Sequence, residues 1–280
     1  MGNVRIVTDS ACDLPRAQLD AAHIEVVPLT IRFGNEEFTD GVDLSNSEFW
    51  KRCSVSARLP ETAAPAPGAF AAAFERAADD GCAGVVAITL SAELSGTYQA
   101  AVVGATQVRD RIDVRVVDSR LVTAAEGLLC LEAADVAATG ADLDTVANHA
   151  TERVANAGLV GVLDTLDHLV KSGRLSGAKA LFGSMLSVKP VLTLRDGLVV
   201  EDGRQRTRAR ALEHLALRAE AAAPFDWLAV AGGDAKDVDV VVRRLAGIEI
   251  SHPMLLTEIG PVVGTHTGPG VVGVCWLTAR

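Results

Sequence analysis

Gly84-Val-Val-Ala-Ile-Thr-Leu90 and the polar segment Ser91-Ala-Glu-Leu-Ser-Gly-Thr-Tyr98 that follows it are the clearest indication of fold class in this chain. The first segment is almost continuously apolar, which is typical of a strand buried on both faces of a parallel sheet. The second is polar and leads into a helical pattern that we expect to run from Tyr98 to Val108. A buried strand, a polar turn and a helix are the repeating unit of an α/β fold.

The same alternation of apolar runs and helical patterns extends to both sides of this segment. We predict strands at residues 4–8 and 112–118, and helices at residues 68–80 and 124–139. Such alternation predicts a parallel sheet with helices on its faces.

The second half of the chain changes character. Asp196-Gly197 separates the apolar runs 188–194 and 198–200, and this dipeptide between two strands is a strong hairpin signal. Antiparallel pairing is therefore predicted here. We expect two domains, a parallel-sheet α/β domain at 1–156 and an α+β domain with a mixed sheet at 157–280. The region around 30–66 could pack with the second domain.

The composition argues against a nucleic-acid partner. The 26 basic and 36 acidic residues give a formal net charge of -10, whereas sequence-independent binding of phosphate backbones needs clustered lysine and arginine. The five cysteines form no C-x-x-C pair and no zinc-like spacing, so we expect reduced thiols and no metal. No run reaches the ~18 apolar residues of a membrane span, and we expect a cytoplasmic protein.

Near the C-terminus, Gly264-Thr-His-Thr-Gly-Pro-Gly270 resembles a ligand-binding loop. Glycines allow close approach of backbone N–H groups, the threonines can donate, and His266 can donate or accept near neutral pH. The overlapping pattern from Gly268 to Gly273 matches the dinucleotide fingerprint. We reject that interpretation because the fingerprint needs a following helix and a distant acidic residue, and few residues follow.

Two polar segments sit where strands should end. Ser95, Gly96 and Thr97 lie near the start of the helix after the buried strand, which suits an anion, although Ser95 could simply cap that helix. Asp9 and its neighbours end the first predicted strand, where open α/β sheets bind ligands; an Asx turn is the alternative.

Other candidates are weaker when read from the residues alone. Thr62, in a proline-punctuated loop, could donate to a ligand, although composition alone favours a plain connector. Arg174 follows a predicted helix end and could cap carbonyls, meet a partner or reach an anion. Basic residues alternate after the hairpin, as a solvated edge or as a docking surface for an acidic partner. They are Arg204, Arg206, Arg208 and Arg210.

An enzymatic interpretation would make Ser95 a nucleophile and His266 its base, with Asp9 or Asp118 as the orienting acid. The chain lacks the G-x-S-x-G elbow and the G-x-x-x-x-G-K phosphate loop. We therefore favour a binding protein over a serine-type hydrolase or acyltransferase.

Taken together, a set of spaced segments resembles the DegV family along nearly the whole chain. These segments are Thr8-Asp-Ser10 with Asp13-Leu-Pro15, Asp40-Gly-Val-Asp43, Leu94-Ser-Gly-Thr-Tyr-Gln99, Val117-Asp-Ser119, Thr165-Leu-Asp-His-Leu169 with Ser172-Gly-Arg-Leu175, Val188-Lys-Pro-Val-Leu-Thr-Leu194 and Ile259-Gly-Pro-Val-Val-Gly-Thr-His-Thr-Gly-Pro-Gly270. The resemblance implies an N-terminal α/β domain of the DegV (EDD-like) type, a C-terminal α+β domain, and one fatty acid between them.

By this resemblance the protein is a lipid-binding protein without catalysis of its own. The carboxylate of a long-chain fatty acid, such as palmitate, stearate or oleate, would be held at the domain interface, with the acyl chain in an apolar tunnel. A separate partner, such as the catalytic subunit of a fatty-acid kinase, would receive the presented ligand. We expect a monomer, no cofactor beyond the bound fatty acid, and no nucleic-acid or integral-membrane partner.

The resemblance implies that Ser95 and Thr62 hold the carboxylate, with His266 close by and Arg174 near the same end or at the partner-facing surface. We assign ligand binding to Thr62, Ser95, Gly96, Thr97, Ser119, Arg174, Thr265 and His266, and partner docking to Arg204 and Arg206. The chain departs from the family pattern after Thr62, where Ala63, Ala64 and Ala66 replace polar residues. Head-group contacts from this segment are therefore reduced.

Overall fold

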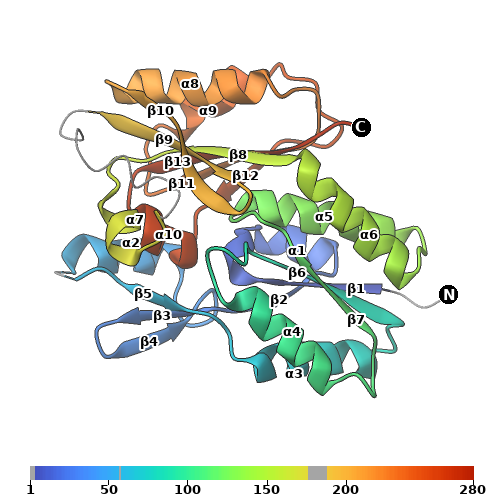
Figure 1. The fold of residues 1–280 in the computed structure, drawn as a ribbon. Coiled ribbons are helices and arrows are strands. Elements are labelled where there is room, and N and C mark those ends of the chain that lie inside the picture. The colour runs from blue at the N-terminus through green and yellow to red at the C-terminus, as the bar shows by residue number, and fades with distance from the viewer. Residues whose placement is uncertain (1–3, 57, 176–187) are drawn as a thin grey trace.

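The computed structural model describes residues 4–56, 58–175 and 188–280. Two larger sheets lie in successive layers with helices between and around them, and a smaller sheet lies at one end (Figure 1). The predicted combination of a parallel-sheet α/β part and a part with a mixed sheet is confirmed.

The first sheet is parallel, with the strand order β2-β1-β6-β7. Its strands are β1 (Val4–Asp9), β2 (Glu25–Val27), β6 (Gly84–Thr89) and β7 (Val114–Asp118). Every residue of β6 is buried, as its apolar sequence predicts. The helices around it are α1 (Arg16–Ala21), α3 (Pro67–Asp79), α4 (Thr97–Gln107), α5 (Ala124–Ala138) and α6 (Leu143–Arg153).

Alternate residues of the central strands face different helices, because successive side chains of a strand point to opposite faces. Val85 and Ala87 pack with α3 and α4, whereas Val86 and Ile88 pack with α5 and α6. The sheet is thus covered on both faces, as a parallel sheet requires.

The second sheet is mixed, with the order β10-β9-β8-β13-β11-β12. Its strands are β8 (Ala157–Val162), β9 (Lys189–Arg195), β10 (Leu198–Gln205), β11 (Phe225–Gly233), β12 (Leu255–Glu258) and β13 (Val271–Thr278). In the predicted hairpin, Asp196 and Gly197 have φ values of 52° and 80°, as a two-residue turn of type I′ requires.

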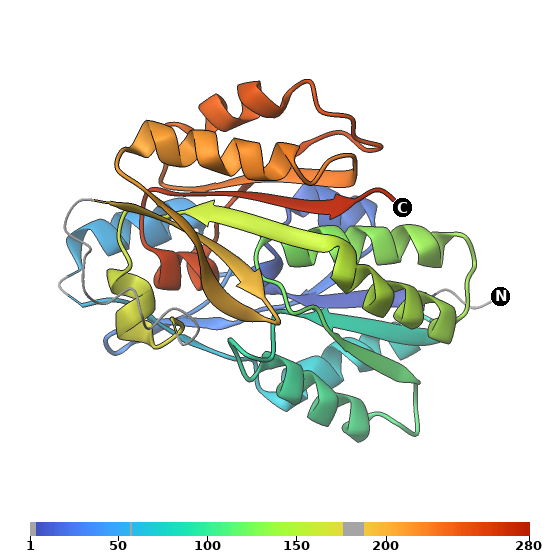
Figure 2. The same ribbon diagram turned by 45° about the horizontal axis from the view of Figure 1, so that its top comes forward.

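Helix α5 separates the two larger sheets (Figure 2). It contacts β1 on one side and β11 and β13 on the other, and 11 of its 15 residues are buried. Helices α8 (Arg208–Glu220) and α9 (Val238–Leu245) cover the outer face of the mixed sheet. One helix therefore packs in the cores of both halves.

A small antiparallel sheet, β4-β3-β5, comes from residues 30–63 and was not predicted. It contains β3 (Thr30–Phe33), β4 (Glu36–Thr39) and β5 (Glu61–Ala63), and α2 (Asn46–Val55) lies between β4 and β5 in the chain. Both β3 and β5 contact α10 (Pro261–Thr267). This small sheet therefore packs against a C-terminal element.

The prediction of a loop at 264–270 is wrong for its first part, because residues 261–267 form helix α10. Pro261 occupies the first helical position, where its missing N–H costs nothing. A Cβ atom at Gly264 would lie 2.7 Å from side-chain atoms of Phe49 and Trp50. Glycine is thus required there for close packing of the helix rather than for loop geometry.

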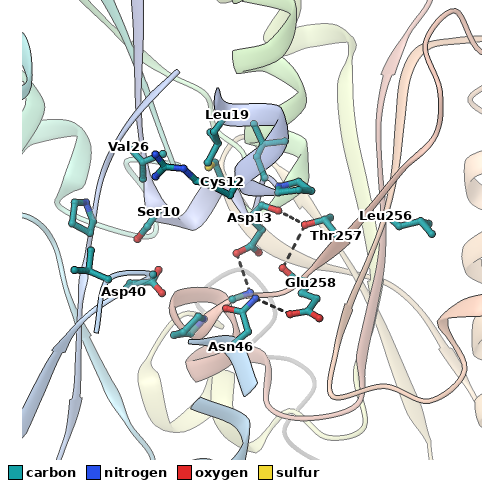
Figure 3. Close-up of a pocket in the computed structure, with 18 residues that line it drawn as sticks. Ser10, Cys12, Asp13, Leu19, Val26, Asp40, Asn46, Leu256, Thr257 and Glu258 are labelled. Atoms are coloured by element: carbon teal, nitrogen blue, oxygen red, sulfur yellow. Dashed lines mark hydrogen bonds between the residues drawn. The ribbon is translucent and has the colours of Figure 1, made fainter. Parts of the chain in front are cut away.

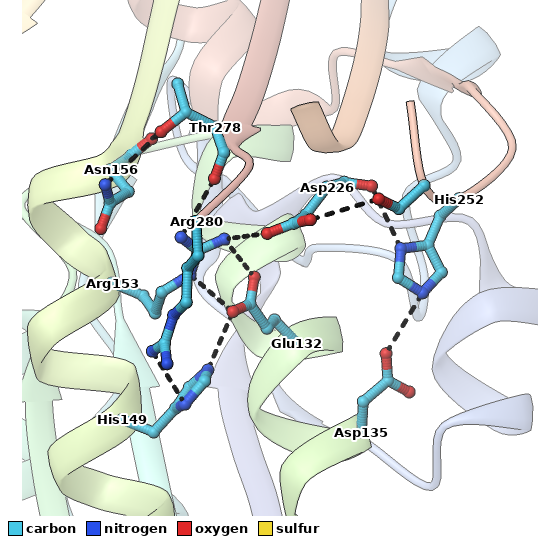
Figure 4. A network of polar contacts seen from close by, with 10 residues as sticks. Glu132, Asp135, His149, Arg153, Asn156, Asp226, His252, Thr278 and Arg280 are labelled. Atoms are coloured by element: carbon cyan, nitrogen blue, oxygen red, sulfur yellow. Dashed lines mark hydrogen bonds and ion pairs between the residues drawn. The ribbon is translucent and has the colours of Figure 1, made fainter. Parts of the chain in front are cut away.

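A buried ion-pair network joins the two halves on another face of α5 (Figure 4). The side chain of Arg153, on α6, is 1% exposed. It donates to Glu132 Oε2 and Asp226 Oδ2, each at 2.9 Å, and to the carbonyl oxygen of Thr278 at 3.0 Å. Glu132 belongs to the first half, and Asp226 and Thr278 belong to the second.

Candidate functional site

A cavity of about 80 Å³ lies between the two halves of the chain, at the edge where the small sheet meets α10. Its walls are mostly apolar and its polar groups gather from distant parts of the sequence. The lining residues are Leu29, Thr62, Leu90, Leu94, Ser95, Val122, Leu169, Arg174, Val199, Val262, Val263, His266 and Thr267. Four residues of the assigned ligand site, Thr62, Ser95, Arg174 and His266, are among them.

Thr62 and His266 are the central polar pair of this cavity. Thr62 lies on β5, whose register places it opposite Ile31 of β3, and His266 lies in the last turn of α10. Thr62 Oγ1 and His266 Nε2 share a hydrogen bond of 3.0 Å across 204 positions of sequence. The buried Nδ1 atom of His266 has no hydrogen-bond partner in the described part of the chain, so it can bind a further polar group.

The electrostatic surroundings keep His266 uncharged. Burial, with the nearby charges of Arg174 and His168, lowers the pKa of His266 to about 4. A neutral imidazole carries one N–H and one lone pair. The ring can therefore bond to Thr62 through one nitrogen and to a ligand oxygen through the other.

We expect a histidine NMR titration to find the ring of His266 neutral throughout the physiological pH range. An unfolded histidine titrates near 6.5, so this residue's contribution to stability is fully present above that pH and is lost as the pH falls towards 4. A bound carboxylate should raise the pKa of His266, because an opposite charge favours the imidazolium. His266→Asn identifies the signal, and titration of that signal near pH 6.5 in the ligand-free protein would contradict the described environment.

Ser95 reaches the cavity from the turn before α4. Its Oγ shares a 2.8 Å hydrogen bond with Thr97 Oγ1 and accepts one of 3.3 Å from the Thr97 backbone N–H. The helix-capping alternative is not met, because Gly96 is the N-cap residue of α4 and this cap has no side-chain hydrogen bond. The Ser95 hydroxyl is oriented by α4, yet it still lines the cavity.

Arg174 bonds to carbonyl oxygens, which is one of the roles that its sequence allowed. Gly173 ends α7 (Asp167–Ser172) with a φ of 75°. The guanidinium then donates to the carbonyl oxygens of Ser172 at 2.7 Å and Leu94 at 3.4 Å. Among the described residues no carboxylate forms an ion pair with Arg174, so its positive charge is available to an anion in the cavity.

The other assigned ligand residues do not line the cavity. Thr97 and Ser119 are fully buried, and Ser119 Oγ accepts from the Leu121 N–H at 3.0 Å. Thr265 donates to the carbonyl oxygen of Pro261 within α10 at 2.8 Å, and it is buried. Gly96 is the N-cap residue of α4 and supports the site indirectly.

Asp9 does not line the cavity, but it bonds to the backbone of a residue that does. Its carboxylate accepts from the Ala11 N–H at 3.0 Å, as in an Asx turn, and from the Leu90 N–H at 2.9 Å. Burial raises the pKa of Asp9 to about 7, and the buried Glu126 lies beside it. Asp9 therefore fixes the backbone of Leu90, a cavity residue.

Several lining residues were not singled out from the sequence. Val122 comes from the loop before α5. Val199 follows the hairpin turn, which is anchored by a 2.8 Å hydrogen bond from Ser91 Oγ to the Gly197 carbonyl. These are apolar or small residues whose convergence depends on tertiary contacts, and no local motif marks them.

The basic stretch after the hairpin does not form one strand or one helix. Arg204 lies near the end of β10 and pairs with Glu201. Arg208 is the first residue of α8 and pairs with Asp237 at 2.8 Å. Arg204 and Arg206 are exposed. The structure places both on the surface of the second half, away from the residues that line the cavity.

Among the residues that the structure describes, no catalytic triad is assembled around Ser95. The hydroxyl bonds to Thr97, and His266 bonds to Thr62. Asp9 binds backbone N–H groups, as does Asp118, which accepts from Ala92 and Arg120. Within the described ranges there is no cluster of three or more histidine, cysteine, aspartate or glutamate residues suited to a metal ion.

Helices of the described part of the chain all fall short of the length and apolar character needed to cross a membrane.

The chain is similar to proteins of one family over almost its full length. The family model described as "Uncharacterised protein, DegV family" matches residues 3–279. A DegV domain-containing protein of Streptomyces coelicolor is 37% identical over 97% of each chain, and one of Halalkalibacterium halodurans is 33% identical over 100% of each.

Solved structures agree with this assignment. A DegV family protein of Thermus thermophilus, described for its fatty-acid binding, has a TM-score of 0.89 and 27% identity, covering 98% of this chain and 99% of its own. DegV of Bacillus subtilis, described as a fatty acid binding protein, has a TM-score of 0.87 and 28% identity over 99% of both chains. A stearic acid-binding protein of Eubacterium ventriosum has a TM-score of 0.84 and 26% identity over 98% of both chains. The chain studied here therefore belongs to the DegV family.

Proposed function

We propose that this protein binds a long-chain fatty acid, such as palmitate, stearate or oleate, between the regions 1–156 and 157–280. The carboxylate would contact Thr62, Ser95 and His266, with Arg174 nearby. The observation that carries the proposal is an apolar cavity between the two halves with hydroxyl, imidazole and guanidinium groups in its wall. The fatty-acid binding described for structurally similar relatives supports the same ligand class.

The polar groups suit a buried carboxylate. Removing a carboxylate from water is costly unless donors replace the lost hydration. The His266 Nδ1 atom has no partner within the described chain, and the Arg174 charge is not neutralised by a described carboxylate. A fatty-acid head group would satisfy both.

The tail would supply most of the binding free energy, at about 0.8 kcal/mol for each buried methylene. The cavity of about 80 Å³ is smaller than the roughly 300–1,000 Å³ of typical ligand pockets. Uptake of a long chain therefore requires the surrounding apolar side chains to move apart and extend the cavity into a tunnel.

In this proposal the protein carries and presents its ligand without chemistry of its own. A partner such as the catalytic subunit of a fatty-acid kinase would act on the carboxylate, and the exposed Arg204 and Arg206 would help to dock it. The absence of a Ser95–His266 hydrogen bond in the described structure favours a carrier over a hydrolase or acyltransferase.

Native mass spectrometry of the purified protein tests the proposal directly. We expect a bound fatty acid, or uptake of added palmitate with a stoichiometry of one. A fluorophosphonate probe should leave Ser95 unlabelled. Failure to retain or take up any fatty acid would refute the carrier function, and labelling that disappears in Ser95→Ala would support an enzyme instead.

Thr62→Val should weaken palmitate binding by about tenfold, because a lost hydrogen bond with an unsatisfied buried partner costs about 1–3 kcal/mol. Isothermal titration calorimetry provides the measurement. Thr106→Val is the matched control, since Thr106 is exposed on α4 and donates only to the Val103 carbonyl within that helix. An equal effect of the two substitutions would argue against Thr62 as a head-group contact.

A further inference from the structure

We propose that Asp13 is a positioning residue of the head-group site, which fixes α10 and the loop before α5 in the arrangement that binds a carboxylate. This inference rests on the proposed fatty-acid function. Asp13 is not a lining residue of the cavity, so it would act through the segments to which it is bonded.

Asp13 joins three segments by hydrogen bonds. Its Oδ2 accepts from Thr123 Oγ1 at 2.6 Å, and its Oδ1 accepts from the Gly260 N–H at 3.0 Å. Its carbonyl oxygen accepts from the Thr257 hydroxyl, and Figure 3 shows Asp13 beside Thr257. One residue of the first half is thus bonded both within its own half and to the segment that leads into α10.

The bonded segments continue directly into the cavity. Gly260 is the N-cap residue of α10, whose residues Val262, Val263, His266 and Thr267 line the cavity. Thr123 follows Val122, another lining residue. The two oxygens of one carboxyl group therefore hold two walls of the same cavity at a fixed separation.

The backbone at this position favours the observed residue type. Asp13 has a φ of 50° and ends the short 3-10 turn Ser10–Cys12. Asparagine and aspartate adopt this left-handed conformation more readily than most other residues. The backbone conformation of Asp13 therefore fixes the direction of its carboxyl group.

The carboxyl group depends on these hydrogen bonds because no cation compensates it. Burial and the nearby Asp40 and Asp9 raise the pKa of Asp13, and no lysine or arginine among the described residues pairs with it. Asp13 also lines an open cleft of about 670 Å³ at the start of α10. Loss of the two acceptors should therefore release the N-terminal end of α10, which borders this cleft.

The test compares Asp13→Ala and Asp13→Asn by their affinities for palmitate and hexadecanol, together with the NMR signal of bound [1-13C]palmitate. Asp13→Ala should weaken palmitate binding about tenfold, change hexadecanol binding less than twofold, and shift or broaden the carboxyl resonance. Asp13→Asn should retain most of the affinity, because its amide oxygen can accept from Gly260 and its amide N–H can donate to Thr123 Oγ1.

Two further variants keep the result interpretable. Thr123→Val removes one of the two side-chain contacts without altering Asp13, and it should change the preference for palmitate over hexadecanol in the same direction as Asp13→Ala. It replaces Asp13→Ala in the test if that variant does not fold. Asp142→Ala removes the N-cap of α6, so it should lower stability without changing that preference.

The outcomes separate the two proposals. Equal weakening of palmitate and hexadecanol by the Asp13 and Thr123 variants, with an unchanged carboxyl resonance, would overturn the positioning role. Wild-type protein that binds no palmitate would instead refute the fatty-acid function itself.

Discussion

Replacing Arg153 by methionine should lower the free energy of unfolding by about 3–5 kcal/mol, the usual cost of breaking a buried ion pair by removing one partner. The guanidinium is almost completely buried and binds Glu132 and Asp226 together. Its removal leaves two carboxylates, one from each half, without their cation. Urea denaturation followed by circular dichroism provides the measurement.

A matched control compares the loss of a buried ion pair with the loss of an exposed one. Arg243→Met removes an exposed pair with Asp239 on α9, and such helical pairs contribute about 0.3–0.5 kcal/mol. Adding Glu132→Gln and Asp226→Asn to Arg153→Met should recover part of the loss, because the uncompensated charges are then absent. A loss below about 1 kcal/mol for Arg153→Met would show that solvent or other donors reach the carboxylates.

Much of the fold could be predicted because its signals are local. The apolar run that forms β6 and the Asp196-Gly197 turn both specify their structure within a few residues. The small sheet also carries such a signal, since Gly34-Asn35 separates β3 from β4, and this two-residue turn type marks hairpins. The flanking strands do not support this signal, because each has only four residues and contains charged side chains.

Helix α10 could not be predicted from its own residues. Glycine and threonine have low helix propensity, and a helix of seven residues is marginal without tertiary packing. The close fit of Gly264 against Phe49 and Trp50 stabilises it. Composition therefore indicates a loop, whereas long-range contacts produce a helix.

The candidate site also combines residues that local sequence indicates with residues that only long-range contacts bring together. Ser95 was accessible to local reasoning because it follows a buried strand and precedes a helix. Thr62 is a weak candidate from its own segment and a stronger one by the family resemblance, but nothing local indicates that it bonds to a residue 204 positions away. Asp13 belongs to one of the segments that resemble the DegV family, but its contacts with Thr123 and Gly260 depend on the folded chain.

If the protein binds a fatty acid as proposed, Val263→Trp should weaken palmitate binding at least ~100-fold, because the indole would occupy the cavity proposed for the acyl chain. Val263 lies on α10 and lines this cavity. Exclusion of four methylenes would cost about 3 kcal/mol at 0.8 kcal/mol each, which is roughly the free energy of a 100-fold change in affinity. Displacement of a fluorescent fatty acid provides the measurement.

Overpacking alone can destabilise a core by about 1–3 kcal/mol, so the dependence on chain length must distinguish a blocked cavity from general damage. A blocked cavity excludes more of a longer tail, and the loss of affinity should therefore grow from octanoate to palmitate. Val240→Trp is the control, because Val240 is 46% exposed on α9 and lies outside the cavity lining. The same fractional loss at every chain length would mean that the acyl chain does not pass Val263, and it would place the tunnel elsewhere between the two halves.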